Sequence, residues 1–218
     1  MNVPAQLLLP LVAAGGVLAG AGLTLLSERL AQAERLELRP PRWERIATPG
    51  LAGIALAALT WRLGVGWPLV IRSLWALVLI QVTFFDLRHR LILDRVLLPA
   101  SLLAAVLSLT TPGLSWQQSL LAGALTGLTF LVLSRAGQVL FRAEALGLGD
   151  VKLSVFLGLC LGFPGVLWAI VAGMLAGGVA AAALLATGRA GRRDHFAYGP
   201  FLAGGSLLAL FLLPTSRA

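Results

Sequence analysis

The sequence predicts an all-α, polytopic transmembrane helix bundle. Three observations support this fold class: 58% of the 218 residues are hydrophobic, only 12% are charged, and the apolar residues form long runs. A soluble domain carries roughly 25% charged residues, because polar groups must cover its surface. The composition therefore excludes an ordinary soluble enzyme, a disordered protein and a soluble nucleic-acid binder.

The apolar runs predict about eight membrane spans in a single integral membrane domain that covers residues 1–218. Each run is bounded by charged residues or by glycine and proline. The first run has no early Lys or Arg, so we expect a retained span rather than a cleaved signal. The second run is short for a span. The predicted spans are residues 5–26, 48–61, 69–85, 96–109, 120–140, 153–161, 166–186 and 198–213.

Basic residues indicate the orientation of these spans. The odd-numbered loops contain all of the 17 basic residues except Arg62, Arg72 and Arg217. Cytoplasmic loops are enriched in Lys and Arg. We therefore predict that the odd loops, beginning with residues 27–46, are cytoplasmic and that both termini lie on the other side. Basic cytoplasmic loops account for the net charge of +8, so no nucleic-acid partner is predicted. The acids of the first loop, Glu44 among them, alternate with arginines and are expected to be solvated.

Two aspartates stand at predicted membrane boundaries on the same side. Asp86 directly follows an apolar run, and Asp150 precedes one. An ionisable group at such a depth is costly and is therefore a candidate for function. Gly147 and Gly149 precede Asp150 with one residue between them. Glycines at a span favour tight helix packing, but they also allow a substrate backbone to lie beside the carboxyl group.

Peptide hydrolysis with an activated water is the chemistry that needs two such acids. Two carboxyls held close together cannot both ionise at low cost, so one keeps a proton while the other acts as a base. This chemistry requires no metal and no cofactor, and neither is predicted. The only histidines are His89, expected in a solvated loop, and His195, while Cys160 is the only cysteine.

The chain resembles the prepilin peptidase family of membrane aspartyl proteases. The first shared motif is Asp86 followed eight residues later by Asp94; the second is Gly147, Leu148, Gly149 and Asp150 with Lys152 two residues on. The last span also resembles the family, with Tyr198, Gly199 and Pro200. The resemblance covers roughly residues 69–213, the expected peptidase core.

The resemblance implies a function in a bacterial cytoplasmic membrane. It implies a catalytic pair of Asp86 and Asp150 near the cytoplasmic face, with Asp94, Lys152 and both glycines shaping the loops or facing the substrate. The implied partners are the lipid bilayer and a prepilin or pseudopilin with a short basic leader and an apolar helix. The oligomeric state is not predicted.

The chain also departs from the family. Leu93 stands where the family often has proline, and the paired cysteines that many members carry in the first loop are missing. Peptidase activity without N-methylation is therefore the favoured interpretation. Two alternatives stay open: a transporter or proton pathway that uses the buried aspartates, and an inactive scaffold for pilus assembly.

Overall fold

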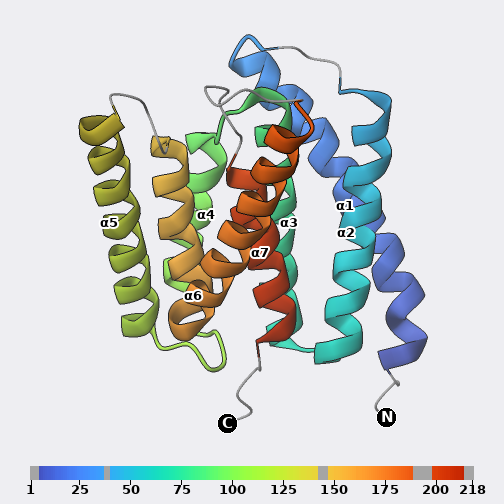
Figure 1. Cartoon of the computed structure of the whole chain (residues 1–218). Helices are drawn as coiled ribbons and strands as arrows, with labels where there is room; N and C mark the ends of the chain where they lie inside the picture. The colour runs from blue at the N-terminus through green and yellow to red at the C-terminus, as the bar shows by residue number, and fades with distance from the viewer. Residues whose placement is uncertain (1–4, 37–39, 142–146, 189–197, 214–218) are drawn as a thin grey trace.

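The computed structural model describes residues 5–36, 40–141, 147–188 and 198–213, and the regular secondary structure in these ranges is all helical. This confirms the all-α prediction. Figure 1 shows the helices packed side by side as a bundle. The described helices are α1 (Ala5–Ala33), α2 (Arg42–Leu63), α3 (Trp67–His89), α4 (Asp94–Leu107), α5 (Trp116–Phe141), α6 (Leu148–Ala186) and α7 (Gly199–Leu212).

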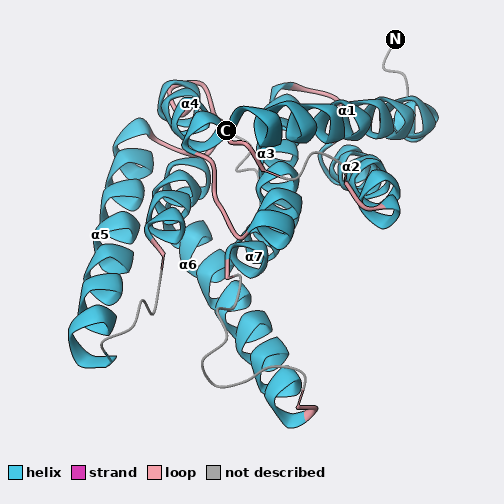
Figure 2. Ribbon diagram, turned by 90° about the horizontal axis from the view of Figure 1, so that it is seen from above, coloured by secondary structure: helices cyan, strands magenta, loops and turns pink. Residues whose placement is uncertain are grey.

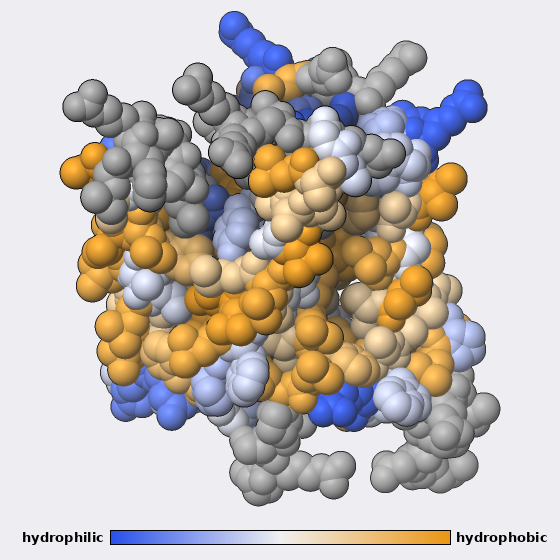
Figure 3. All heavy atoms as spheres, in the orientation of Figure 1, coloured by the Kyte–Doolittle hydropathy of each residue, from blue (hydrophilic) through white to orange (hydrophobic). Residues whose placement is uncertain are grey.

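The surface of the bundle is suited to lipid. Five of the described helices, α1, α2, α3, α5 and α6, are long and apolar enough to cross a membrane. Large apolar side chains such as Leu18, Leu102 and Val179 are exposed, where water would be unfavourable and lipid is not. In Figure 3 an apolar belt separates hydrophilic residues at the two ends of the molecule. Together these features describe an integral membrane protein.

Helix α6 contains the two segments that were predicted as the sixth and seventh spans. Its backbone leaves the helical conformation at Gly162 (φ 59°) and Phe163, next to Pro164. The positive φ at Gly162 is a conformation that suits glycine. Figure 1 shows the first arm descending beside α5 and the second arm rising again, so that α6 has the shape of a V. The total of eight membrane crossings and the side of each terminus stay predictions.

The charged segment 27–46 is mostly helical rather than a long loop. Helix α1 continues to Ala33 and α2 begins at Arg42. Glu, Arg, Leu, Ala and Gln, which fill the end of α1, are all good helix formers. Residues 37–39 lie outside the described residues. The expectation that Glu44 is solvated was wrong: it is 1% exposed, and its carboxylate lies 4.0 Å from Arg88, because α2 packs against the end of α3.

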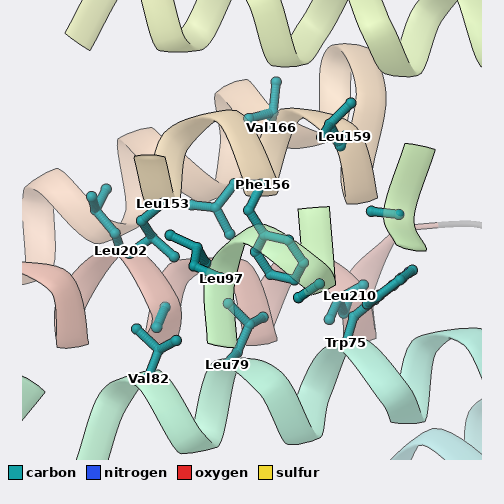
Figure 4. Packing of buried hydrophobic residues seen from close by; sticks show 14 of the residues in the cluster. Trp75, Leu79, Val82, Leu97, Leu153, Phe156, Leu159, Val166, Leu202 and Leu210 are labelled. Carbon is teal, nitrogen blue, oxygen red and sulfur yellow. The ribbon is translucent and has the colours of Figure 1, made fainter. Parts of the chain in front are cut away.

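The main core lies between α3, α4, α6 and α7. Trp75 of α3 meets Phe156 of α6 edge to face, with ring centroids 5.7 Å apart. Figure 4 shows the apolar side chains of these helices pointing toward one another. Hydroxyl groups join α5 to the first arm of α6: Ser119 donates to the carbonyl of Leu159 at 2.7 Å, and Thr126 donates to that of Ser154 at 2.9 Å.

The four central helices bring three of their N-termini and one C-terminus to the same end of the bundle. Viewed from above, α3, α4, α6 and α7 occupy the middle, with α5 on one side and α1 and α2 on the other (Figure 2). The C-terminus of α3 and the N-termini of α4, α6 and α7 meet at the top in Figure 1. At the opposite end, Arg62 and Arg72 donate to carbonyls in the last turn of α7, where positive charge is favourable.

Candidate active site

Asp86 occupies the last turn of α3 and is 5% exposed. Its carboxyl accepts a hydrogen bond from the backbone N–H of Gly199, the first residue of α7. Helix α3 ends at His89, and its capping residue Arg90 adopts a left-handed conformation (φ 51°) and donates its N–H to the Asp86 carbonyl at 2.8 Å. This cap turns the chain sharply, so that α4 starts beside the end of α3.

Asp150 lies in the first turn of α6 and is half-buried. Its carboxyl accepts a hydrogen bond from the N–H of Gly147, the residue that caps the helix. An acid at this position commonly reaches back to the cap and satisfies a donor that the helix leaves free. The carboxyls of Asp150 and Asp86 are close enough for their charges to interact. The structure therefore brings together two aspartates that are 64 positions apart in the sequence.

Ile92, in the connection between α3 and α4, lies close to the N-termini of both α6 and α7. A Cβ atom built on Gly149 would lie 3.1 Å from Cβ of Ile92, and one built on Gly199 would lie 3.2 Å from its Cδ1. Both distances are tighter than about nine in ten real Cβ contacts. Gly149 thus lets the start of α6 approach the α3–α4 connection. This gives the second glycine of the motif a packing role at the site.

Tyr198 caps the N-terminus of α7 and is half-buried. Its ring packs against the second arm of α6, where a Cβ on Gly177 would lie 3.0 Å from Cε2. Tyr198 is also close enough to Asp150 for the aspartate charge to act on it.

Lys152 and Asp94 form an ion pair between α6 and α4. The Lys152 Nζ lies 2.7 Å from each carboxylate oxygen of Asp94. The two side chains are 43% and 50% exposed. The pair connects the two sequence motifs at the rim of the site. Asp94 is thus paired with Lys152, whereas the carboxyl that acts on Asp150 is that of Asp86.

Several other ionisable groups at this end form contacts separate from the aspartate pair. Glu34 pairs with Arg95 at 3.4 Å, and Glu28 with Arg45 at 3.5 Å. His89 was expected in a solvated loop, but it ends α3, is half-buried and has its ring 4.6 Å from that of Phe85. Among the described residues, no three His, Cys, Asp or Glu side chains form a group that could hold a metal ion. His195 lies outside the described residues.

A family model described as the type IV leader peptidase family matches residues 73–182, about half of the chain and including both motifs. The chain belongs to the type IV leader peptidase family. Three relatives are each named prepilin leader peptidase/N-methyltransferase. The relative from Xanthomonas campestris is 30% identical over 74% of this chain and 56% of its own length. That from Bacillus subtilis is 32% identical over 70% of this chain and 60% of its own.

The third relative, from Myxococcus xanthus, is 30% identical over 66% of this chain and 44% of its own length. The chain thus spans about half the length of the leader peptidase relatives it matches. No solved structure matches it significantly. The family match ends at residue 182, so Tyr198 and Gly199 lie beyond it.

The contact of Gly199 with Asp86 was not predicted from the sequence. In the sequence, the motif of Tyr198, Gly199 and Pro200 shows only a resemblance to the leader peptidase family. A glycine and a proline at the start of a predicted helix were the available signal. They predict where the helix begins, but not which side chain its first N–H meets.

Proposed function

We propose that this chain is a membrane aspartyl endopeptidase that removes the short basic leader from type IV prepilin-like or pseudopilin precursors. Asp86 and Asp150 are the proposed catalytic residues. The observation that carries the proposal is the meeting of these two carboxyls at the ends of α3 and α6, each bonded to a backbone N–H at a helix start. Membership of the type IV leader peptidase family supports the reaction class.

The proposed reaction uses one ionised and one protonated carboxyl. The carboxylate takes a proton from a water molecule, and the water oxygen bonds to the scissile carbonyl carbon. The protonated partner gives its proton to the carbonyl oxygen, which forms a neutral tetrahedral intermediate. The C–N bond then breaks as the amine receives a proton from the carboxyl that had acted as base. One hydroxyl of the intermediate returns its proton to the other carboxylate, so the products are a carboxylic acid and a free amine, and the pair again holds a single proton.

We propose that cleavage takes place at the cytoplasmic boundary of a bacterial inner membrane. Asp86 lies in the last turn of one apolar helix and Asp150 in the first turn of another, which suits a scissile bond at a membrane surface. Most basic residues of the sequence belong to segments predicted to lie at this end, as cytoplasmic segments do. The apolar helix of the substrate would remain in the bilayer.

Cleavage by the purified full chain in detergent tests the catalytic roles. The substrate is a prepilin-like protein with a basic leader and an apolar helix. Asp86→Asn and Asp150→Asn are each expected to lower kcat by about 100-fold or more, because each removes one side of the proton transfer. Asp94→Asn is the matched control. It is expected to stay within about 10-fold of the wild type, because it removes only an exposed ion pair.

Two results would contradict this assignment. Asp86→Asn or Asp150→Asn with wild-type kcat would remove that residue from the mechanism, and a large loss in Asp94→Asn alone would move the role to Asp94. A parallel sample with a chelator is expected to cleave at the same rate. Loss of cleavage with the chelator, restored by added metal ions, would contradict the metal-free mechanism.

We propose the peptidase reaction without the N-methyltransferase activity that the relatives' names include. The support is the sequence, in which Cys160 is the only cysteine. The cleavage assay is repeated with S-adenosylmethionine, and the new N-terminus is analysed by mass spectrometry. An unmethylated N-terminus is expected, and a methylated one would contradict this part of the proposal.

The proposed topology is tested with two single-cysteine variants of a Cys160→Ser background. Gln32→Cys lies near the end of α1 on the side of the site, and Gln117→Cys lies at the start of α5 on the opposite side; both positions are exposed. In intact spheroplasts, a membrane-impermeant maleimide is expected to label Gln117→Cys and not Gln32→Cys. The reverse pattern would place the site on the outer side.

A further inference from the structure

The start of α7 directs one backbone donor away from its own helix. The N–H groups of Phe201 and Leu202 bond to the carbonyl of Tyr198, at 3.1 and 3.3 Å, and Pro200 has no N–H. A helix normally begins with four donors that lack partners within the helix. Here the N–H of Gly199 is the first-turn donor that reaches another element, and it donates to the carboxyl of Asp86.

The approach of α7 to Asp86 depends on glycine at position 199. A Cβ atom there would lie 2.6 Å from Oδ2 and 3.2 Å from Cγ of Asp86. Real Cβ atoms essentially never come within 3.0 Å of another heavy atom. Any larger residue at 199 would therefore push the carboxyl from its place or move the start of α7. Gly199 is buried, so little free space is available for either change.

The residue before Gly199 packs the start of α7 against a second element. The ring of Tyr198 lies against the second arm of α6, where a Cβ on Gly177 would lie 3.0 Å from Cε2. The start of α7 is therefore held between the end of α3 and the second arm of α6, which fixes the direction of the Gly199 N–H.

We propose that Gly199 is a positioning residue: its N–H fixes the carboxyl of Asp86, and its lack of a side chain lets the start of α7 reach that carboxyl. This inference rests on the proposed function, because positioning matters only if the two carboxyls react. It assigns a role to a motif that lies outside the matched family region. It also places the N-terminus of α7 in the site, although neither of the two aspartate motifs includes a residue of α7.

The first test compares Gly199→Ala with Gly204→Ala in the cleavage assay. Both replace a glycine of α7 by alanine, but a Cβ at Gly204 meets nothing within 4 Å. Gly199→Ala is expected to lower kcat by about 100-fold with little change in KM, because a shift of about 1 Å in a reacting group has an effect of this size. Gly204→Ala is expected to keep wild-type kcat. Wild-type kcat in Gly199→Ala, or equal losses in both variants, would overturn the role of Gly199.

The second test needs neither substrate nor activity. Unfolding of Gly199→Ala and Gly204→Ala in mixed micelles with increasing SDS is followed by circular dichroism. Gly199→Ala is expected to unfold at a lower SDS fraction, because its Cβ would lie 2.6 Å from Oδ2 of Asp86. Equal unfolding midpoints would overturn the close contact of Gly199 with Asp86.

The two measurements separate the inference from the proposed function. If the wild type cleaves no prepilin-like substrate while Gly199→Ala unfolds at a lower SDS fraction than Gly204→Ala, the proposed function fails and the contact of Gly199 with Asp86 stands. A lower unfolding midpoint in Gly199→Ala with wild-type kcat would reduce Gly199 to a packing role and overturn its role in positioning.

Discussion

Helix α5 lies in close contact with the first arm of α6, the arm that carries Asp150, and a substitution at Gly158 tests this contact. A Cβ built on Gly158 would lie 2.6 Å from the carbonyl carbon and oxygen of Ala122 and from Cα of Gly123. These are backbone atoms, so no side chain can rotate away. In Gly158→Ala the two helices must separate by about 0.8 Å to restore ordinary contact.

The expected magnitude follows from this separation. Overpacking of a close interface costs about 1–3 kcal/mol. Replacing glycine by alanine in a helix also gains up to about 1 kcal/mol of helix propensity, which would hide part of the loss. Gly178→Ala is the matched control, because Gly178 lies on the same helix and its Cβ would meet nothing within 4 Å. The propensity gain then cancels, and Gly158→Ala should be less stable than Gly178→Ala by about 1–3 kcal/mol.

Unfolding in mixed micelles with increasing SDS, followed by circular dichroism, measures this difference. Gly158→Ala should unfold at a lower SDS fraction than Gly178→Ala. The hydroxyl bonds of Ser119 and Thr126 to α6 should weaken in the same variant, since both cross the interface that must open. Equal unfolding midpoints for the two alanine variants would refute the close α5–α6 contact described above.

Two further predictions concern charged groups at opposite ends of the bundle. Lys152→Met removes the ion pair with Asp94; because both side chains are about half exposed, we expect the free energy of unfolding to change by less than about 1 kcal/mol, measured by the same SDS titration. Arg72→Met removes the charged donor to the carbonyls of Leu210 and Leu213, and we expect a loss of about 1.5–3 kcal/mol in that titration. A larger loss in Lys152→Met than in Arg72→Met would contradict this ranking.

The apolar runs of the sequence predicted that the chain forms a series of apolar helices, because segments that face lipid must be apolar along their whole length. They did not predict the full extent of α1 and α2, because the added turns are charged but contain good helix formers. Gly162 and Pro164 predicted a break between two spans. They could not predict that the arms form a V within one element, since that depends on the packing of α6 against α5 and α7.

The two aspartates could be chosen as candidates from the sequence because each has a local signal, an acid at the edge of an apolar run. The burial of Glu44 beside Arg88 could not be predicted, because both belong to segments rich in charge and only tertiary packing separates the buried acid from the solvated ones. The contact of Gly199 with Asp86 joins residues that are 113 positions apart. No local pattern encodes such a pairing.

The surroundings of the aspartate pair also favour hydrolysis over a proton pathway. The pair lies at one end of the bundle, whereas coupling sites of transporters lie near the middle of the membrane. Among the described residues, the core between α3, α4, α6 and α7 is filled by apolar side chains such as Leu79, Leu153 and Phe156. A proton path across this layer would need polar groups or water. Proteoliposomes containing a pH-sensitive dye should therefore show equal proton leak with the wild type and Asp86→Asn, and a proton flux that Asp86→Asn abolishes would support transport instead.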